Sequence, residues 1–259
     1  MIEAIIAFLA GLLIGSFLNV CIHRLPRDLS IVQPRSFCPN CKRTIAWYDN
    51  IPLLSYALLR GRCRYCGQRI AIGYPVVELT TAVCFAICVG TLGPTLPALK
   101  WCVFSALLIA LTATDFEQRI LPNELTIGGT AAGLAFALVV PLYPGAEPLA
   151  SFEASLLGAA VAGGSIWFVG WAYKKVRRRE GMGFGDVKMI AMMGAFLGAR
   201  DALLTMAAGS ALGAIAGIAF IKIAGKDPST YELPFGSFLG IAGLLVTVFI
   251  EVLGWPALG

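Results

Sequence analysis

Long apolar runs alternate with short polar segments along almost the whole chain. A membrane-crossing helix needs about 20 mostly apolar residues. Runs that approach this length fall near 4–22, 75–93, 97–114, 124–142, 152–173, 187–199, 202–221 and 235–253. The sixth run is short, which also fits a tilted or half-buried segment. The pattern predicts an all-α polytopic membrane protein with about eight transmembrane helices.

The composition agrees with this fold class. The chain is 58% hydrophobic and 14% charged, whereas soluble domains are about 45–50% apolar and about 25% charged. The first apolar run has Glu3 as its only early charge and is followed by His23 and Arg24. It lacks the basic segment that precedes the apolar part of a signal peptide, so an uncleaved membrane anchor is predicted.

The distribution of Lys and Arg predicts the orientation in the membrane. Of the 20 Lys and Arg residues, 18 fall in alternate loops, at 23–74, 115–123, 174–188 and 222–234. Positively charged loops stay on the cytoplasmic side. This face is therefore predicted to be cytoplasmic, with both termini outside. The strongly basic 23–74 loop is tethered to the bilayer, which favours anionic lipid headgroups over nucleic acid as its partner.

Two carboxylates lie at the predicted cytoplasmic ends of apolar runs. Asp115 follows the third run, and Asp186 precedes the sixth. Carboxylates at membrane depth are costly and are therefore candidates for function. Two carboxylates at one face can share a proton and activate a water molecule, as in aspartic proteases. The helix dipole favours Asp186, near a helix start, as the base and Asp115, near a helix end, as the acid.

Alternating glycines at 181, 183 and 185 precede Asp186. Without Cβ atoms they allow positive φ or the close approach of an extended peptide. The alternative is a flexible glycine turn in which Asp186 is only a helix N-cap. A nucleotide-binding loop is excluded, because no strand precedes these glycines and no Gly-Lys-Ser/Thr sequence follows them.

Four cysteines of the 23–74 loop form two Cys-x-x-Cys pairs with 21 residues between them: Cys38, Cys41, Cys63 and Cys66. This spacing is typical of a four-thiolate zinc site. Structural disulfides are rare in the cytoplasm, so zinc is favoured over two disulfides or a redox pair. Four thiolates close the coordination shell, and the predicted zinc is therefore structural. The loop is predicted to be a small cytoplasmic zinc-knuckle domain.

Taken together, these motifs resemble the bifunctional type IV prepilin peptidases, the prepilin leader peptidase/N-methyltransferases. The resemblance covers nearly the whole chain. Its motifs are the segments 15–26, 47–52, 60–64 and 74–79, the cysteine pairs, Asp115 seven residues before Pro122, and Gly-x-Gly-Asp at 183–186. The last two motifs characterise the Gly-x-Gly-Asp membrane aspartyl proteases. One departure is Asn123, where the family usually has Asp.

The resemblance implies a first transmembrane helix at 1–22, the zinc loop domain at 23–74 and a membrane aspartyl protease domain at 75–259. It implies that Asp115 and Asp186 are the catalytic pair. The protein would remove the basic leader of prepilins and pseudopilins at the cytoplasmic face of the bacterial inner membrane. It would then methylate the new N-terminus with S-adenosylmethionine.

The resemblance assigns no residues to the methyl donor, and the sequence has no Rossmann-type fingerprint for it. Arg24, Asp49 and Glu78 are polar residues within matched motifs, but salt bridges and helix caps explain them equally well. The sequence leaves three alternatives open. They are a peptidase without methyltransferase activity, an ion-coupled transporter that uses Asp115 and Asp186, and a scaffold whose zinc loop recruits a partner. The transporter predicts carboxylates near the membrane midplane and an inverted repeat.

Overall fold

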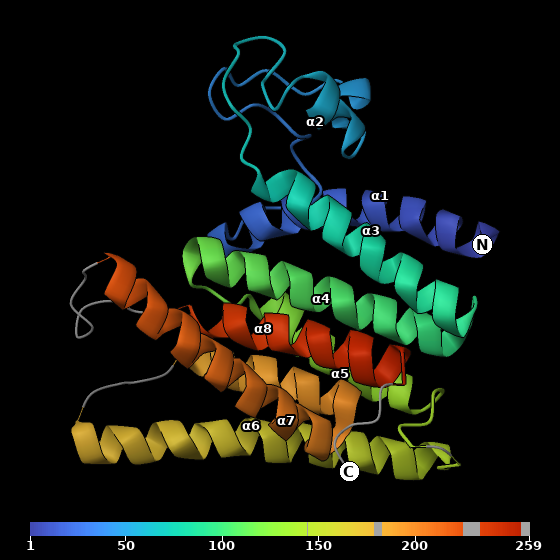
Figure 1. The fold of residues 1–259 in the computed structure, drawn as a ribbon, viewed down its shortest axis with the longest axis vertical. Coiled ribbons are helices and arrows are strands. Elements are labelled where there is room, and N and C mark those ends of the chain that lie inside the picture. Colours follow the sequence, from blue (N-terminus) through green and yellow to red (C-terminus); the bar gives the residue numbers. More distant parts are fainter. Residues whose placement is uncertain (144, 179–182, 225–233, 255–259) are drawn as a thin grey trace.

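The computed structural model describes residues 1–143, 145–178, 183–224 and 234–254. Within these ranges the fold is helical and contains no β-strand, only two isolated bridges in the 23–74 loop. The elements are α1 (Ile2–Arg24), η1 (Leu25–Arg27), η2 (Trp47–Asn50), α2 (Leu54–Leu58), α3 (Gly73–Leu92), α4 (Leu96–Gln118), α5 (Asn123–Ala137), α6 (Pro148–Arg177), α7 (Phe184–Ala224), α8 (Phe235–Val246) and the π-helical turn η3 (Thr247–Val252) (Figure 1).

Six segments in the described ranges are long and apolar enough to cross a membrane: Ile2–Arg27, Gly73–Leu92, Leu96–Gln118, Pro148–Arg177, Phe184–Ala219 and Phe235–Val252. The predicted class of an all-α polytopic membrane protein is confirmed. Two predicted runs differ from the structure. The run at 124–142 corresponds to α5, which has only 15 residues. The runs at 187–199 and 202–221 both lie within α7.

A glycine divides α7 into two helical halves. Gly198 has φ 80° and ψ 175°, which interrupts the helix. A Cβ at this position would lie 2.7 Å from the Tyr143 hydroxyl. Both the positive φ and the close contact require glycine. The break therefore lies at Gly198, whereas the apolar pattern places it at 200–201.

Glycines also allow two helix pairs to approach closely. On α1, a Cβ at Gly11 or Gly15 would lie 2.6 Å and 2.7 Å from the Cα atoms of Ala82 and Glu78 on α3. A Cβ at Gly158 of α6 would lie 2.4 Å from a carbonyl oxygen of α7. Small residues four apart are a common means of packing transmembrane helices, because backbones can then touch.

Helix α4 is the most buried of the candidate spans, with 61% of its apolar window inside the protein. Its Phe104 ring stacks on Phe196 of α7 with centroids 4.5 Å apart. Leu108 and Leu111 of α4 are fully buried in the same core. This packing fixes the end of α4, where Asp115 lies, against α7 and α8.

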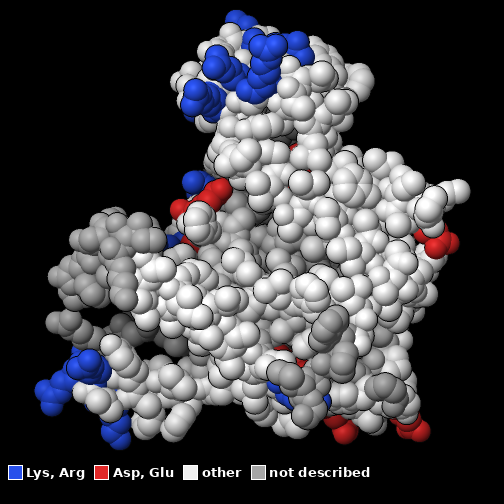
Figure 2. Space-filling view, viewed as in Figure 1, with Lys and Arg blue, Asp and Glu red and all other residues white. Residues whose placement is uncertain are grey.

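The loop domain, residues 25–72, projects from the helical body between the end of α1 and the start of α3 (Figure 1). Its only helical elements are η1, η2 and α2, so most of it is irregular. Lys and Arg side chains gather over this domain and over the end of α6, while the body shows a small group of charged side chains just below the loop domain and others only near its edges (Figure 2). The molecule therefore has a basic, irregular part and an apolar, helical part.

Candidate active site

Asp115 lies in the last turn of α4, because the helix continues to Gln118 rather than ending at 114. The residue is 6% exposed. Its Oδ2 atom accepts two hydrogen bonds from Ser237, from the backbone amide at 2.6 Å and from the hydroxyl at 2.8 Å. Ser237 belongs to the first turn of α8. The carboxylate is thus held in place by a helix that begins more than 100 residues later in the chain.

Asp186 lies in the first turn of α7, which begins at Phe184. It is the third residue of the helix, and its amide donates to the Gly183 carbonyl at 3.2 Å. Asp186 is therefore a helical residue and not the flanking N-cap of the alternative hypothesis. Gly185 is also helical, and a Cβ there would lie 3.2 Å from the Leu121 side chain. Close packing against Leu121, rather than a positive φ, therefore explains why residue 185 is a glycine. Gly181 lies outside the described residues.

Leu121, in the connection between α4 and α5, joins the starts of α7 and α8. Leu121 packs against Gly185 of α7 and also against Gly236 of α8. A Cβ added at Gly236 would lie 3.2 Å from the Leu121 side chain and 3.0 Å from the carboxylate carbon of Asp115. The two carboxylates are close enough for their charges to interact. Lys188, two residues after Asp186, donates a hydrogen bond to Asn123 Oδ1. The residue that departs from the family pattern thus also fixes the start of α7.

Three helices far apart in sequence therefore bring two carboxylates and a serine to one end of the bundle. Two interacting carboxylates can hold one proton between them and activate a water molecule. Ser237 was not predicted from the sequence. The available signal was its position in the first turn of the last apolar run, at the membrane face predicted for both aspartates. Nothing in the local sequence distinguishes it from an ordinary helix-start serine.

The four loop-domain cysteines lie together. Their Sγ atoms are all within 4.8 Å of one another, and the Cys38 and Cys66 sulfurs are 3.8 Å apart. A tetrahedral zinc site with Zn–S bonds of about 2.3 Å places its sulfurs about 3.8 Å apart. The four-thiolate donor set therefore fits a closed metal site. These cysteines could hold a metal ion, as the spacing predicted.

The two Cys-x-x-Cys knuckles have the same backbone pattern. The amides of Cys38 and Cys63 donate to carbonyls five residues later, at 2.9 and 2.8 Å. Positive φ angles occur four residues after each of these cysteines, at Lys42 and Gly67. In the second knuckle, hydrogen bonds from the Gln68 amide and then the Asn40 side chain lower the pKa of Cys66 to about 6. A thiolate at neutral pH is the form that binds metals.

The polar residues of the matched motifs have partners within the chain. Arg64 pairs with Asp49 at 2.6 Å, and this guanidinium lowers the pKa of the Asp49 carboxyl group. Glu78 Oε2 accepts from the Leu53 amide at 2.8 Å. Arg24 donates to two backbone carbonyls of the loop domain at 2.8 and 2.6 Å. Ion pairing and backbone capping therefore account for all three residues.

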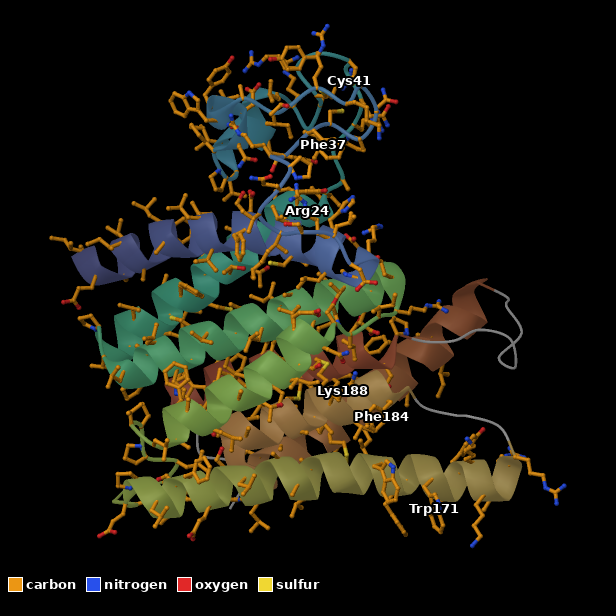
Figure 3. All side chains as sticks on the ribbon, turned by 180° about the vertical axis from the view of Figure 1, so that it is seen from behind. Arg24, Phe37, Cys41, Trp171, Phe184 and Lys188 are labelled. Carbon is orange, nitrogen blue, oxygen red and sulfur yellow. The ribbon has the colours of Figure 1, made fainter. Side chains whose placement is uncertain are left out.

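The metal cluster and the carboxylates lie in different parts of the molecule. Viewed from behind, Cys41 lies near the tip of the loop domain, Arg24 at its base, and Phe184 and Lys188 at the start of α7 well below (Figure 3). The thiolates are thus remote from the carboxylate pair. A metal held there is suited to a structural role.

Two protein-family models match the chain. Residues 9–92 match the Bacterial Peptidase A24 N-terminal domain, and residues 102–218 match the Type IV leader peptidase family. No solved structure gives a match.

Individual relatives of this chain indicate the same family. A protein of Myxococcus xanthus (strain DK1622) is 43% identical over 226 residues, which are 86% of this chain and 64% of the relative. One from Klebsiella pneumoniae is 40% identical over 197 residues, 74% of this chain and 83% of the relative. One from Aeromonas salmonicida (strain A449) is 36% identical over 269 residues, 94% of this chain and 90% of the relative. All three are named prepilin leader peptidase/N-methyltransferase.

The sequence-based resemblance is confirmed by these matches. The relatives are named as enzymes, which removes the basis for the transporter and scaffold alternatives. The matched ranges extend over most of the chain, and the positions of both aspartates and both cysteine pairs fall within them. The chain therefore belongs to the type IV leader peptidase family.

Proposed function

We propose that this multi-pass membrane protein removes the leader peptides of prepilins and pseudopilins and then methylates the new N-terminus. The observation that carries the proposal is the pair of interacting carboxylates, Asp115 and Asp186, in a chain that resembles prepilin leader peptidase/N-methyltransferases throughout. The basic loops support a location in the bacterial inner membrane with the site at the cytoplasmic face. The proposed units are the helix 1–22, the loop domain 23–74 and the protease domain 75–259.

In the proposed mechanism Asp115 is the ionised base and Asp186 the protonated acid. Two donors from Ser237 stabilise a negative charge on Asp115. Hydrogen bonds to charged groups contribute about 1.5–3 kcal/mol each, whereas a helix end contributes about 0.3–1 kcal/mol. The direct bonds therefore outweigh the helix dipole, and this assignment reverses the one expected from the sequence.

Hydrolysis then balances as follows. The oxygen of a water molecule bonds to the scissile carbonyl carbon while one of its protons passes to Asp115 and the proton of Asp186 passes to the carbonyl oxygen. The carbon–nitrogen bond then breaks as Asp115 returns its proton to the leaving amine. One hydroxyl proton of the diol returns to Asp186, which restores both carboxyl groups.

The loop domain supplies no group to this hydrolysis. We propose that Cys38, Cys41, Cys63 and Cys66 hold a structural zinc ion that fixes the fold of the domain. S-adenosylmethionine, when bound, supplies a methyl group. The lone pair of the new amine bonds to the methyl carbon as the carbon–sulfur bond breaks, leaving a neutral thioether and a proton released to water. Residues of this chain must therefore bind S-adenosylmethionine and leave its methyl group accessible to the new N-terminal amine.

The test uses purified protein and a prepilin-like peptide that contains the leader junction, with and without S-adenosylmethionine. Mass spectrometry should show a peptide shortened by the leader in both cases, and an additional methyl group only with the donor. Cleavage by the Asp115→Ala or Asp186→Ala protein would overturn the catalytic assignment. Cleavage without methylation would favour the second candidate, a peptidase alone.

A further inference from the structure

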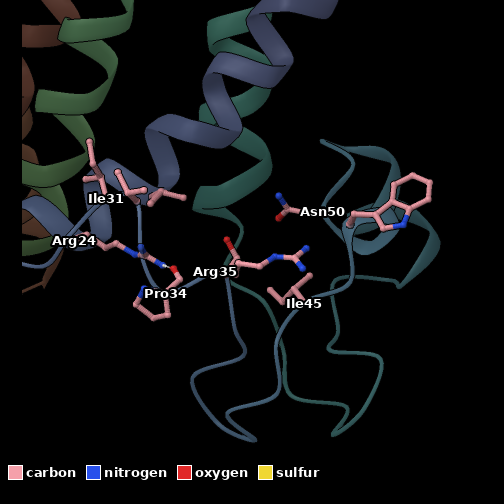
Figure 4. Close-up of a pocket in the computed structure, with 10 residues that line it drawn as sticks. Arg24, Ile31, Pro34, Arg35, Ile45 and Asn50 are labelled. Carbon is pink, nitrogen blue, oxygen red and sulfur yellow. Dashed lines mark hydrogen bonds between the residues drawn. The ribbon is translucent and has the colours of Figure 1, made fainter.

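Lys100, in the second turn of α4, is a charged side chain that the proposed mechanism does not use. It is 3% exposed, and its Nζ atom lies 4.2 Å from the centre of the Trp101 ring. By contrast, Arg35 is exposed beside a hollow of about 280 Å³ between α1 and the loop domain (Figure 4). Lysines near the end of a membrane helix normally reach water as well, because a buried ammonium group is costly. Lys100 therefore needs a compensating interaction inside the protein.

Glu251 supplies this interaction. It belongs to η3, the π-helical turn that continues α8, and it lies close enough to Lys100 for the two charges to interact. The two groups form no direct ion pair among the described residues. They act on each other as nearby charges, and such forces are strong where water is excluded. Asp201 of α7 also lies near Glu251, but it has the same charge and repels it. Lys100 thus links α4 to the end of α8.

Four pairs of residues interact along one antiparallel seam between α4 and α8. Each step along α4 toward its end is matched by an equal or nearly equal step toward the start of α8, so the seam has a single register. A Cβ added to either glycine of the seam would press on the facing α4 side chain. The pairs are Lys100–Glu251, Leu108–Gly243, Thr112–Gly240 and Asp115–Ser237.

The middle of the seam does not by itself select this register. Gly236, Gly240 and Gly243 recur every turn of α8, so a shift of one turn would again place glycines beside side chains of α4. The Thr112 hydroxyl is buried without a hydrogen-bond partner in the described structure, and it adds no selective bond. The polar contacts at the two ends therefore distinguish this register from its neighbours. Single buried polar contacts have this role in coiled coils.

We propose that Lys100 is a positioning residue for the carboxylate site. With Glu251 it selects the register of α8 that places Ser237 against Asp115, about 22 Å farther along α4 at 1.5 Å per residue. A shift of one turn, about 5.4 Å, would remove both the amide and the hydroxyl donor from Asp115. This inference rests on the proposed peptidase function, because it acts through the partner of a catalytic carboxylate.

The experiment separates folding from positioning with a neutral pair, Lys100→Met/Glu251→Gln, in the full-length protein. No uncompensated charge then remains in the seam, so the midpoint of thermal unfolding should lie near that of the wild type, whereas Glu251→Gln alone should lower it. The turnover number for the prepilin-like peptide should nevertheless approach the loss of about tenfold expected for Ser237→Ala, with KM changed less than about twofold. Glu153→Gln, which changes an exposed carboxylate near the start of α6, is the matched control and should alter none of these quantities.

Two further variants show whether Lys100 acts through Ser237. Adding Ser237→Ala to the neutral pair should lower turnover by less than about threefold, because molecules in another register already lack this contact. The exchanged pair Lys100→Glu/Glu251→Lys should restore turnover to within about threefold of the wild-type value, because it restores opposite charges at the end of the seam.

A folded neutral pair that cleaves at the wild-type rate would overturn the inference. A further loss of about tenfold on adding Ser237→Ala would also overturn it, because the two sites would then act independently. If the neutral pair does not fold, the exchanged pair is decisive, and a folded protein no faster than Ser237→Ala contradicts the register role. Wild-type protein that cleaves no peptide would contradict the proposed function instead. The thermal midpoints still test the pair in that case, since equal losses in Glu251→Gln and in the neutral pair would show that Lys100 and Glu251 do not interact.

Discussion

The loop domain and the helical bundle assemble their sites in opposite ways. In the loop domain, two short knuckles each carry two ligands three residues apart, and both have the same hydrogen-bond pattern. In the bundle, Asp115, Asp186 and Ser237 come from α4, α7 and α8, and long-range packing brings them together. The metal site thus depends on the local backbone geometry of each knuckle and on the packing of the two knuckles against each other. The carboxylate site depends on how whole helices pack.

This difference determines what each part tolerates. A ligand change should remove the metal from the loop domain and leave the helices of the bundle intact. A packing change in the bundle should move catalytic groups without touching the metal. Four substitutions, one in the loop domain and three in the bundle, each with a matched control, separate the two parts experimentally.

The largest effect should follow from Cys63→Ser. Structural zinc contributes about 10–16 kcal/mol to the folding of small metal domains. Loss of one thiolate should therefore reduce bound metal well below one ion per chain and unfold the loop domain. The helical circular dichroism should remain, because the bundle holds most of the helix. Metal analysis and circular dichroism are the measurements, with Cys84→Ser, a buried cysteine of α3, as the control. Full metal content in Cys63→Ser would contradict the proposed ligand set.

The Asp186→Asn variant should reduce peptide cleavage at least about 10³-fold, since an amide cannot donate the proton that the carboxyl group supplies. Asp201→Asn, in the second half of the same helix α7, is the matched control and should cleave as the wild type does. Bound metal should be unchanged in both proteins. Equal losses in both variants would mean that helix stability, rather than the chemistry of Asp186, is being measured.

The Gly158→Ala variant tests the packing of α6 against α7. The new Cβ would lie 2.4 Å from the Gly194 carbonyl oxygen, so the two helices must separate. Overpacking of this kind costs about 1–3 kcal/mol. The thermal midpoint should therefore fall. Gly164→Ala on the same helix, where a Cβ meets nothing within 4 Å, should leave the midpoint unchanged or raise it slightly. A similar response of both variants would show that close backbone packing is unimportant here.

The smallest effect should follow from Ser237→Ala, which removes the hydroxyl donor to Asp115 but keeps the backbone donor. The turnover number should fall about tenfold, and the acid limb of the pH–rate profile should move. Ser237→Thr should restore both, because it keeps the hydroxyl group. Ser210→Ala is the control, since among the described residues the Ser210 hydroxyl donates to the Met206 carbonyl of its own helix. A lower rate with an unchanged pH profile would assign Ser237 a purely structural role.

The apolar pattern predicted most of the bundle, but the ends and breaks of helices differed from it. Helix α4 runs past 114 to Gln118, with Asp115 buried against Ser237 of α8, and α5 is shorter than its apolar run. Hydropathy reports the solvent that a segment prefers and cannot report where a backbone turns. The break lies at Gly198, where the backbone packs so close to Tyr143, distant in sequence, that a Cβ would not fit.

The sequence alone determined the class of the protein, the two cysteine pairs, the two aspartates and the common face predicted for those aspartates. Each of these follows from spacing, charge or hydropathy, which act along the chain. Only the tertiary structure revealed Ser237 as the partner of Asp115, Leu121 as the contact between α7 and α8, and the hollow beside Arg35. These features arise where residues distant in sequence meet, and their contacts depend on packing that no local pattern encodes.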